Sequence, residues 1–383
     1  MPLEPELTGL FLLNGEGVWL LGNGGRFVFA DTLQLRLDRE EPEIGNRLNE
    51  LYFTLNPVDY FFLDLGKQVV VSGGGFFLNP AGLWPEQTTW RQDRTLPPEG
   101  KVIVRGEYLF SHLTMEVGWA PQLAWAENKD GVLWRYIGSP QKTAQTWVMV
   151  SSGLAGVDLG VLLAYRGRWK AGLSLAKVWG ERLATHCAIG WEERDKSQAE
   201  QGNKLYRVLV EEATGAAPPP LKATTAQGNF QALVGGHYTF TGGENLIVEY
   251  FFNGTGMTRQ EWERVLYYLD ASTGLVSDVQ NGPLVAARLQ KANAFLTEAG
   301  FSGLLRHYVM ARFYKTVLPS VAWEQMMIQN LVDRSGLALF YLRFERDRFG
   351  LALGVQQPYG KNASEFGLLN SERQVTLQIH FGL

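Results

Sequence analysis

Residues 374–383 read QVTLQIHFGL, and this stretch decides the fold class of the chain. Its apolar side chains occupy every second position, and polar or small residues fill the positions between them. A period of two is the pattern of a β-strand with one apolar face. The same alternation recurs in residues 26–38, 157–166 and 348–357. These runs of about 9–12 residues exceed the usual soluble strand and approach the length that a tilted strand needs to cross a bilayer.

Extended over the whole chain, the pattern predicts sixteen strands. They cover residues 26–38, 47–55, 60–71, 101–110, 113–120, 144–152, 157–166, 169–178, 182–191, 229–240, 246–253, 304–314, 321–331, 336–345, 348–357 and 374–383. Residues 6–13 and 16–22 are an alternative further hairpin, which would raise the number of strands to eighteen.

The connections between these strands alternate in length. Tight ones cover residues 56–59, 111–112, 153–156, 179–181 and 241–245, and the long ones cover residues 72–100, 121–143, 192–228 and 254–303. Two connections on the long side, 167–168 and 332–335, are also brief, but none on the other side is long. This asymmetry is typical of outer-membrane barrels, which have short periplasmic turns and long extracellular loops.

The number and length of the strands indicate that the sheet closes on itself. An open sheet of sixteen long strands would expose two edges, and no helices recur between the strands to cover a second face. A soluble barrel of this width would enclose a large polar void. We therefore expect an all-β fold: one transmembrane antiparallel barrel over residues 1–383, with apolar side chains facing lipid. Residues 1–22 would add a hairpin or a periplasmic extension.

Composition excludes several other classes of protein. Aromatic residues make up 12% of the 383 residues, which is too rich for a disordered chain, and one Cys cannot form a disulfide framework. The balance of 35 basic and 39 acidic residues, without a basic run, indicates no nucleic-acid partner. Residues 143–165 are the most apolar stretch but contain Asp158, so no spanning helix is predicted.

The first residues, MPLEPE, carry no secretory signal. Such a start fits a cytosolic protein and equally a mature exported chain with a new initiator Met. Together with the barrel pattern, it leads us to expect a mature protein of the bacterial outer membrane.

The long connection over residues 254–303 differs from the other loops. Thr258 and Glu261 form a capping-box pattern ahead of Trp262, so part of this extracellular insertion is predicted to be helical. Two interpretations stay open: the insertion is a surface cap, or it folds into the mouth and narrows the pore.

Aromatic residues gather near the predicted strand ends, where interfacial belts form in membrane barrels. They are Tyr52, Tyr60, Phe61, Phe62, Tyr165, Trp169, Trp179, Trp191, Tyr238, Phe240, Tyr250, Phe349 and Phe381.

Short motifs also resemble a known family. Gly66-Lys67-Gln68 is followed by Gly73-Gly74-Gly75 and then Asn79-Pro80. This order resembles Gram-negative outer-membrane porin-like barrels, including alginate-export-type channels, in which a strand carrying Gly-(Arg/Lys)-Gln leads to a Gly-rich stretch and Asn-Pro. The hairpin over residues 234–254 and the terminal residues 381–383 are similar to the same barrels. The resemblance implies a channel in the outer membrane.

If the apolar face meets lipid, the opposite face lines a pore. The predicted charged pore-lining residues are Arg36, Glu50, Asp64, Arg105, Glu107, Glu116, Asp158, Arg166, Lys170, Glu249, Arg306, Arg312, Arg343 and Glu345, with His186 beside them. Three pairs share strand faces and suggest charge ladders across the wall: Arg105–Glu107, Asp158–Arg166 and Arg343–Glu345.

A lumen of both signs favours small polar or ionic solutes without strong selection for one sign. An arc of Arg306, Arg312 and Arg343 is the sub-hypothesis for anion preference. The alternative is that these charges pair with one another and only stabilise the wall.

Signals for catalysis and for cofactors are weak. The five His residues, His112, His186, His237, His307 and His380, show no metal-ligand spacing, and no nucleotide-binding or nucleophile-elbow motif occurs. We expect no enzyme, no cofactor and no metal. The leading hypothesis is a passive channel, a porin in contact with outer-membrane lipid. The alternative is a barrel that sheathes a partner such as a periplasmic multihaem cytochrome, or a surface receptor.

Overall fold

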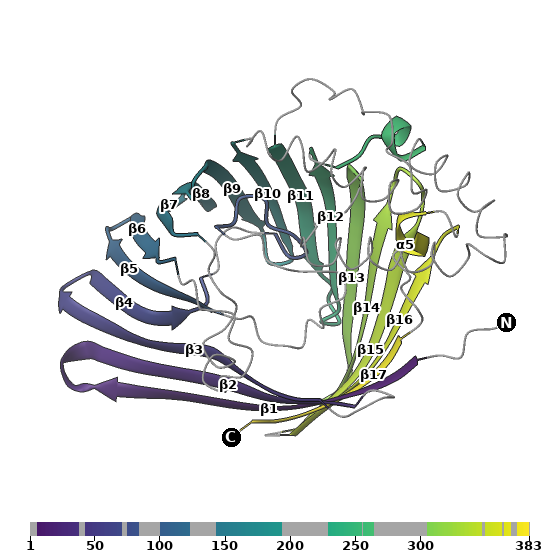
Figure 1. The fold of residues 1–383 in the computed structure, drawn as a ribbon, viewed down its shortest axis with the longest axis horizontal. Coiled ribbons are helices and arrows are strands. Elements are labelled where there is room, and N and C mark those ends of the chain that lie inside the picture. The colour runs from purple at the N-terminus through teal and green to yellow at the C-terminus, as the bar shows by residue number, and fades with distance from the viewer. Residues whose placement is uncertain are drawn as a thin grey trace, which may run out of the picture.

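The computed structural model describes residues 6–37, 43–70, 75–83, 100–122, 143–193, 229–254, 256–263, 305–346, 349–361, 364–368 and 374–382. These residues form one sheet of seventeen strands (Figure 1). The strands are β1 (Glu6–Leu21), β2 (Gly25–Leu37), β3 (Glu43–Val58), β4 (Phe61–Gln68), β5 (Lys101–Leu109), β6 (Leu113–Ala120), β7 (Gln145–Leu154), β8 (Val157–Tyr165), β9 (Trp169–Trp179), β10 (Leu183–Glu192), β11 (Asn229–Thr239), β12 (Asn245–Asn253), β13 (His307–Leu318), β14 (Val321–Asn330), β15 (Gly336–Arg346), β16 (Phe349–Tyr359) and β17 (Gln374–Gly382). A 3-10 turn, η1 (Gly22–Gly24), joins β1 to β2, and a short helix, α5 (Glu365–Leu368), precedes β17.

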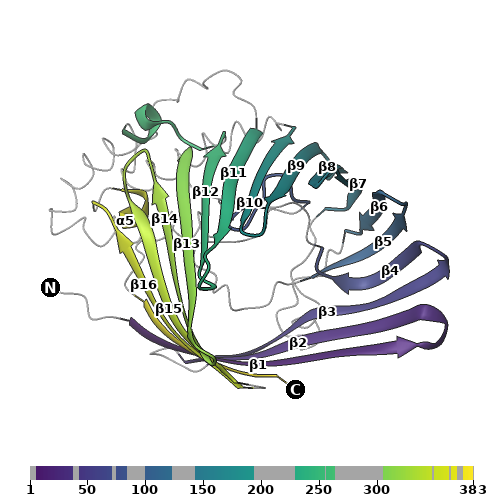
Figure 2. The same cartoon turned by 180° about the vertical axis from the view of Figure 1, so that it is seen from behind.

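The strand pairings run around a ring. Each strand pairs antiparallel with the next one in the chain, from β1 to β17. β17 then pairs with β1 in parallel, from Glu6 opposite Gln374 to Asn14 opposite Gly382. Every described strand therefore has a partner on both sides. Figure 2 shows the same arrangement from behind.

All sixteen predicted strands are present, which confirms the all-β antiparallel fold class. The proposed extra hairpin over 6–13 and 16–22 is wrong, because β1 runs without a break from Glu6 to Leu21. Its residues Asn14 and Gly15 pair with Thr32 and Asp31 of β2 and make no turn. The total is seventeen, neither sixteen nor eighteen. Because the closing pair is parallel, the start of β1 and the end of β17 lie at opposite rims.

One rim of the ring carries only brief connections. Residues 59–60, 110–112, 155–156, 180–182, 240–244 and 319–320 join successive strands there, and we call it the short-turn rim. At the opposite, long-loop rim, the strands are joined through residues 69–100, 121–144, 193–228 and 254–306. The predicted asymmetry of the connections is confirmed.

The structure tests the helical prediction for residues 254–303 only at the start of that range, over residues 256–263. Residues 259–263 are helical. The capping box is present, because the amide of Thr258 donates to Glu261 Oε2 at 2.7 Å and the amide of Glu261 donates to Thr258 Oγ1 at 3.2 Å. Residues 264–304, and with them the choice between surface cap and inward fold, lie outside the described residues.

The two faces of the sheet differ in chemistry. In β6, Met115, Val117 and Trp119 are exposed on one face, whereas Glu116 between them is buried. We call the face that carries Met115 and Trp119 the outer face and the face that carries Glu116 the inner face. The same alternation in β8 exposes Leu159, Val161 and Leu163 on the outer face and buries Leu162 and Ala164 on the inner face. Among the helices that the structure describes, none is long and apolar enough to span a membrane.

Aromatic side chains border the outer face at both rims. Trp119, Tyr165, Trp169 and Trp191 are exposed near the long-loop rim, and Tyr60, Tyr108, Phe110, Trp179, Tyr238 and Phe240 are exposed near the short-turn rim. Trp169 and Trp179 begin and end β9. At about 3.3 Å per residue they are about 33 Å apart along the strand, or about 25 Å along the axis for a tilt of about 40°. Tyr52 departs from this pattern, because it is buried on the inner face beneath the guanidinium of Arg26.

Gly66 provides a test of how tightly the sheet is built. Its φ of 133° lies in the region that favours glycine, and an added Cβ would lie 2.3 Å from the carbonyl oxygen of Leu51. We expect Gly66→Ala to lower the free energy of unfolding by about 1–3 kcal/mol, because backbone atoms must move. Denaturant unfolding of the purified protein measures the loss. Gly45→Ala is the control, since nothing lies within 4 Å of its added Cβ; equal stability of the two variants would contradict the prediction.

Candidate functional site

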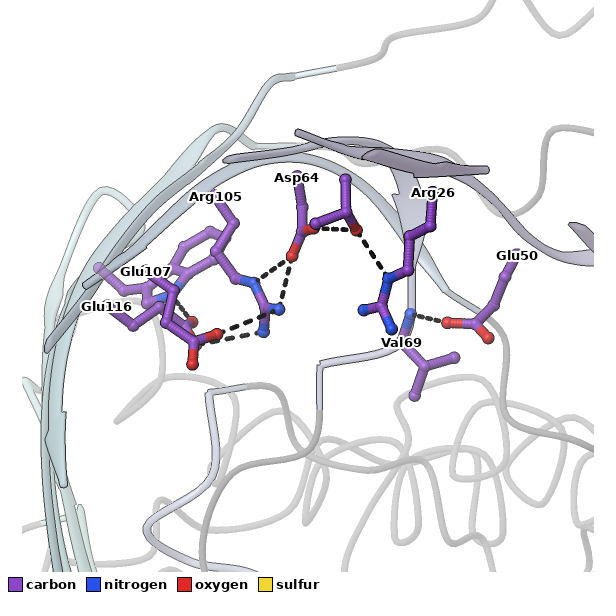
Figure 3. Close-up of polar contacts among 9 residues, drawn as sticks. Arg26, Glu50, Asp64, Val69, Arg105, Glu107 and Glu116 are labelled. Carbon is purple, nitrogen blue, oxygen red and sulfur yellow. Dashed lines mark hydrogen bonds and ion pairs between the residues drawn. The ribbon is translucent and has the colours of Figure 1, made fainter. Parts of the chain in front are cut away.

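Arg105 is the centre of a charged network on the inner face. Its Nη2 atom lies 2.5 Å from Asp64 Oδ2 and 3.5 Å from Glu107 Oε2, and its Nη1 atom lies 3.3 Å from Glu116 Oε2 (Figure 3). The strand register explains this grouping, because Asp64 is opposite Arg105 and Glu107 is opposite Glu116 on neighbouring strands. Asp64 and Glu116 are only 2% and 4% exposed. One guanidinium thus serves three carboxylates.

Further hydrogen-bond donors extend this network along the wall in both directions. Thr54 donates to Asp64 at 2.6 Å, and Arg26 Nε donates to Thr54 Oγ1 at 3.0 Å. On the other side, the indole of Trp147 donates to Glu116 at 2.6 Å. A Cβ at Gly118 would lie 2.0 Å from that indole, so only glycine leaves room for the ring. The Arg105 network therefore runs from β2 to β7.

A second charged group joins β13, β14 and β15. Arg312 Nε donates to Glu324 Oε1, and Arg343 Nη2 lies 2.9 Å from Glu324 Oε2. Both guanidinium groups also lie over aromatic rings: Arg312 is 5.0 Å from the centre of Phe76, and Arg343 is 5.6 Å from the centre of Tyr341. A single carboxylate therefore holds two arginines against the wall.

Residues 75–83, which we call the inner segment, belong to the β4–β5 connection but lie against the inner face of distant strands (Figure 1). The amides of Phe76 and Phe77 donate to the two carboxylate oxygens of Glu249 at 2.6 and 2.9 Å. His186 Nε2 lies 2.7 Å from the same carboxylate. Glu249 is fully buried. A carboxylate of β12 thus fixes the start of the inner segment.

Two glycines of the wall receive the middle of the inner segment. Gly172 of β9 and Gly190 of β10 are cross-strand partners. A Cβ at Gly172 would lie 2.6 Å from the carbonyl oxygen of Ala81, and one at Gly190 would lie 2.0 Å from that of Pro80. Because neither glycine has a side chain, the pair forms a recess in the wall, and the backbone of Pro80 and Ala81 fills it.

The end of the inner segment is also anchored to the wall. Lys170 donates to the carbonyl of Gly82, and Gln145 Nε2 donates to that of Leu83 at 3.3 Å. Leu83 packs with Ile103 and Trp147 in an apolar cluster on the inner face. The sequence pattern predicts a polar inner face, and the structure corrects this, because the inner face is not polar throughout. Toward the long-loop rim it carries buried apolar residues, among them Ile103, Trp147, Leu233, Phe251 and Met310.

Four charged residues and His186 lie at one level of the ring. Asp64, Glu116, His186 and Glu324 are each the fourth residue of their strands, counted from the short-turn rim. Arg343 is the fourth residue from that rim in β15, which ends there. At about 3.3 Å per residue, all of them stand about 10 Å along the strand from the short turns. They form one charged belt around the inner face.

The structure brings together some of the predicted residues and separates others. Asp64, Arg105, Glu107 and Glu116 meet in one network, and Arg312 meets Arg343. The predicted Arg105–Glu107 pair is present. The Asp158–Arg166 pair is not formed, because these residues stand at opposite ends of β8. Arg343 pairs with Glu324 of the neighbouring strand and not with Glu345.

The remaining predicted residues have other surroundings. Glu50 accepts the amide of Val69 at 2.8 Å (Figure 3), and Arg306 Nε donates to the carbonyl of Gly256 at 2.9 Å near the long-loop rim. Asp158, Arg166 and Glu345 are exposed at strand ends. Arg36 lies in β2, opposite Leu10 and Glu43 in the register.

Sequence reasoning missed Glu324 and the inner segment. Glu324 had a visible signal, since it is a lone charge between Ala322 and Met326 on the inner face of β14. The inner segment had only a weak one, because its anchor Glu249 is 172 residues from Phe77 in the chain. In the described ranges, no group of three or more His, Cys, Asp or Glu side chains is placed to hold a metal ion.

Comparisons with known proteins give structural likenesses only. No family model matches the chain, and no curated protein matches it. The chain is similar to the outer membrane protein OprD from Pseudomonas aeruginosa, with 9% identity, a TM-score of 0.45 and coverage of 94% of this chain and 82% of that one. A mutant Rh. blastica porin gives 8% identity, a TM-score of 0.44 and coverage of 86% and 87%.

A third likeness is to Wzi from Escherichia coli, described as a carbohydrate-binding outer-membrane β-barrel involved in capsule assembly. It gives 9% identity, a TM-score of 0.46 and coverage of 93% and 80%. Identities and scores at this level assign no function to the chain.

The Arg105 network predicts a large loss of stability when its cation is removed. Arg105→Leu would leave the buried Asp64 and Glu116 without their guanidinium, and we expect the free energy of unfolding to fall by about 3–5 kcal/mol. Denaturant unfolding measures the change. The control is Arg259→Gln, which breaks the exposed Arg259–Glu263 pair and should alter stability by less than about 1 kcal/mol. A loss for Arg105→Leu no greater than that of the control would refute the assigned role.

The recess at Gly190 predicts that a single methyl group loosens the inner segment. In Gly190→Ala the added Cβ meets the backbone of Pro80, so the segment must move away. We expect hydrogen exchange of the Phe76 and Phe77 amides to speed up by about tenfold or more. Gly236→Ala is the control, because the nearest atom to its added Cβ is 3.5 Å away. Unchanged exchange in Gly190→Ala would show that the recess does not position the segment.

Proposed function

We propose that the protein is a channel of the bacterial outer membrane, through which small polar and ionic solutes diffuse passively. The observation that carries the proposal is the inversion of the two faces of the ring. Apolar side chains are exposed on the outer face, whereas the charged belt and the Arg105 network are on the inner face.

The outer face supports a lipid environment. Soluble proteins rarely expose contiguous apolar patches larger than a few hundred Å², whereas exposed Leu, Val, Trp and Tyr side chains continue from strand to strand here. The two aromatic borders, about 25 Å apart along the axis, match the apolar band and aromatic girdles of outer-membrane barrels. In this proposal the short-turn rim is periplasmic and the long-loop rim is extracellular.

The inner face supports an aqueous path. A closed ring of about sixteen to eighteen strands leaves a channel wider than its own wall side chains can fill. In our proposal the predicted charged residues near the short-turn rim, including Glu107, Asp158, Arg343 and Glu345, line that path. The inner segment narrows it, and Phe76 is its most exposed side chain. No catalytic role is assigned to any of these residues.

A second candidate function is a plugged barrel that acts as a scaffold or receptor for a partner protein. The observation that favours it is the apolar cluster of Leu83, Ile103, Trp147 and Leu162, which closes part of the inner face toward the long-loop rim. In this version the inner segment blocks the passage and does not merely narrow it.

Electrical recording from the purified protein separates these functions. We expect stepwise single-channel currents in planar bilayers, from protein that depends on detergent and migrates faster on a gel before boiling than after it. Heat-modifiable protein that gives no current at any voltage would favour the plugged scaffold. Protein that stays dispersed and folded in buffer without detergent would contradict both functions, since the outer face would then not meet lipid.

A further inference from the structure

The inner face carries an excess of carboxylates near the short-turn rim. We consider only the inner-facing residues among the seven positions of each strand nearest that rim. In β4, β5 and β6 this region holds Asp64, Glu107 and Glu116 against the single guanidinium of Arg105. This sector therefore has three acidic groups against one guanidinium and the buried Lys67, the seventh residue of β4.

The arginines of β13 and β15 do not restore the balance. Arg312 and Arg343 share Glu324, and Glu345 lies two residues beyond Arg343 on the same face. This sector has two acidic and two basic groups. The anion-selective arc expected from Arg306, Arg312 and Arg343 is therefore not formed, because two of its members neutralise Glu324 and Arg306 is bound to Gly256 near the other rim.

The rest of the ring adds three carboxylates and one guanidinium. Glu16 of β1, Asp158 of β8 and Glu249 of β12 are opposite the inner-facing Ala30, Ala176 and Gly235 in the register. Arg26 of β2 is the basic member, and among the described residues it donates to Thr54 and to no carboxylate. Over the described strands, the seven-residue region next to the short-turn rim thus carries eight carboxylates against four guanidinium groups and the buried Lys67.

The carboxylates in excess are also those that water and solute can reach. Glu16, Asp158 and Glu345 are exposed, and within the part of the chain that the structure describes none of them has an ion-pair partner. Three of the four guanidinium groups, by contrast, lie against carboxylates. A wall charge acts on a passing ion over a Debye length of about 10 Å at 0.1 M salt.

From this distribution we infer that the path through the ring selects small cations over anions at its short-turn end. The inference rests on the proposed channel function and names its solute class. Negative wall charge raises the local concentration of cations and lowers that of anions, as rings of Asp and Glu do in cation-selective pores. The inference replaces the expectation of weak selectivity between the two signs.

The reversal potential across a tenfold KCl gradient tests the inference. We expect its sign to report a K⁺ to Cl⁻ permeability ratio above 1. The double variant Asp158→Asn with Glu345→Gln removes two exposed carboxylates that have no ion-pair partner, and it should lower the ratio by about twofold. Arg26→Gln removes a guanidinium that has no carboxylate partner among the described residues, and it should raise the ratio. Raising the KCl concentration on both sides should weaken both effects by screening.

Two controls keep the outcomes distinct. Glu263→Gln changes an exposed carboxylate outside the strands and should leave the ratio unchanged, and heat-modifiable migration on a gel shows that each variant is folded. A wild-type ratio at or below 1, or a shift of the same sign in the acidic double variant and in Arg26→Gln, would overturn the inference while leaving the channel intact. Folded protein without any current would instead overturn the proposed function.

Discussion

The closed ring of backbone hydrogen bonds is the constraint on which the rest of the structure depends. A strand without a second partner leaves a row of unpaired N–H and C=O groups, and in hydrocarbon each of them costs several kcal/mol. Sixteen antiparallel pairings alone would leave β1 and β17 with open edges. The parallel pairing between these two strands removes both edges. An odd number of strands is therefore compatible with closure, provided that one pair gives up the antiparallel geometry.

Closure creates a second requirement, because a wide ring encloses more space than its inward side chains can occupy. The inner segment, which is part of the β4–β5 connection, occupies some of this space. Gly172 and Gly190 have no side chains, so the backbone of Pro80 and Ala81 can approach the wall. Glu249 is buried away from water, and its carboxylate is instead hydrogen-bonded by two backbone amides and lies beside His186. A buried carboxylate is costly unless its oxygens are hydrogen-bonded. The inner segment and the wall therefore stabilise one another. We expect neither the inward position of the segment nor the burial of Glu249 without the other.

The strands could be predicted from the sequence because their signal is local, whereas the inner segment could not. Alternation is repeated within each strand, so the sixteen predicted strands needed no knowledge of their partners. The sequence predicts a hairpin over residues 6–13 and 16–22 because Asn14 and Gly15 favour a turn, and only the pairing of β1 to β2 and β17 overrides that preference. The contacts of Phe77 with Glu249 and of Gly82 with Lys170 join positions far apart in the chain. No periodicity reports such contacts. The charged inner-facing residues of the Arg105 network could be predicted by parity, and so could the Arg105–Glu107 pair on one strand, but the partners on neighbouring strands could not.

The position of the charged belt follows from the turns. A connection of two or three residues fixes the register of the strands it joins, so a residue at a given distance from the turn on one strand meets its counterpart on the next. The short β5–β6 turn therefore brings Arg105 to Glu116, and the short β13–β14 turn brings Arg312 to Glu324. Long connections impose no such register. Wall charges that select solutes are therefore aligned most reliably at the short-turn end, because the short turns fix the register of the strands there.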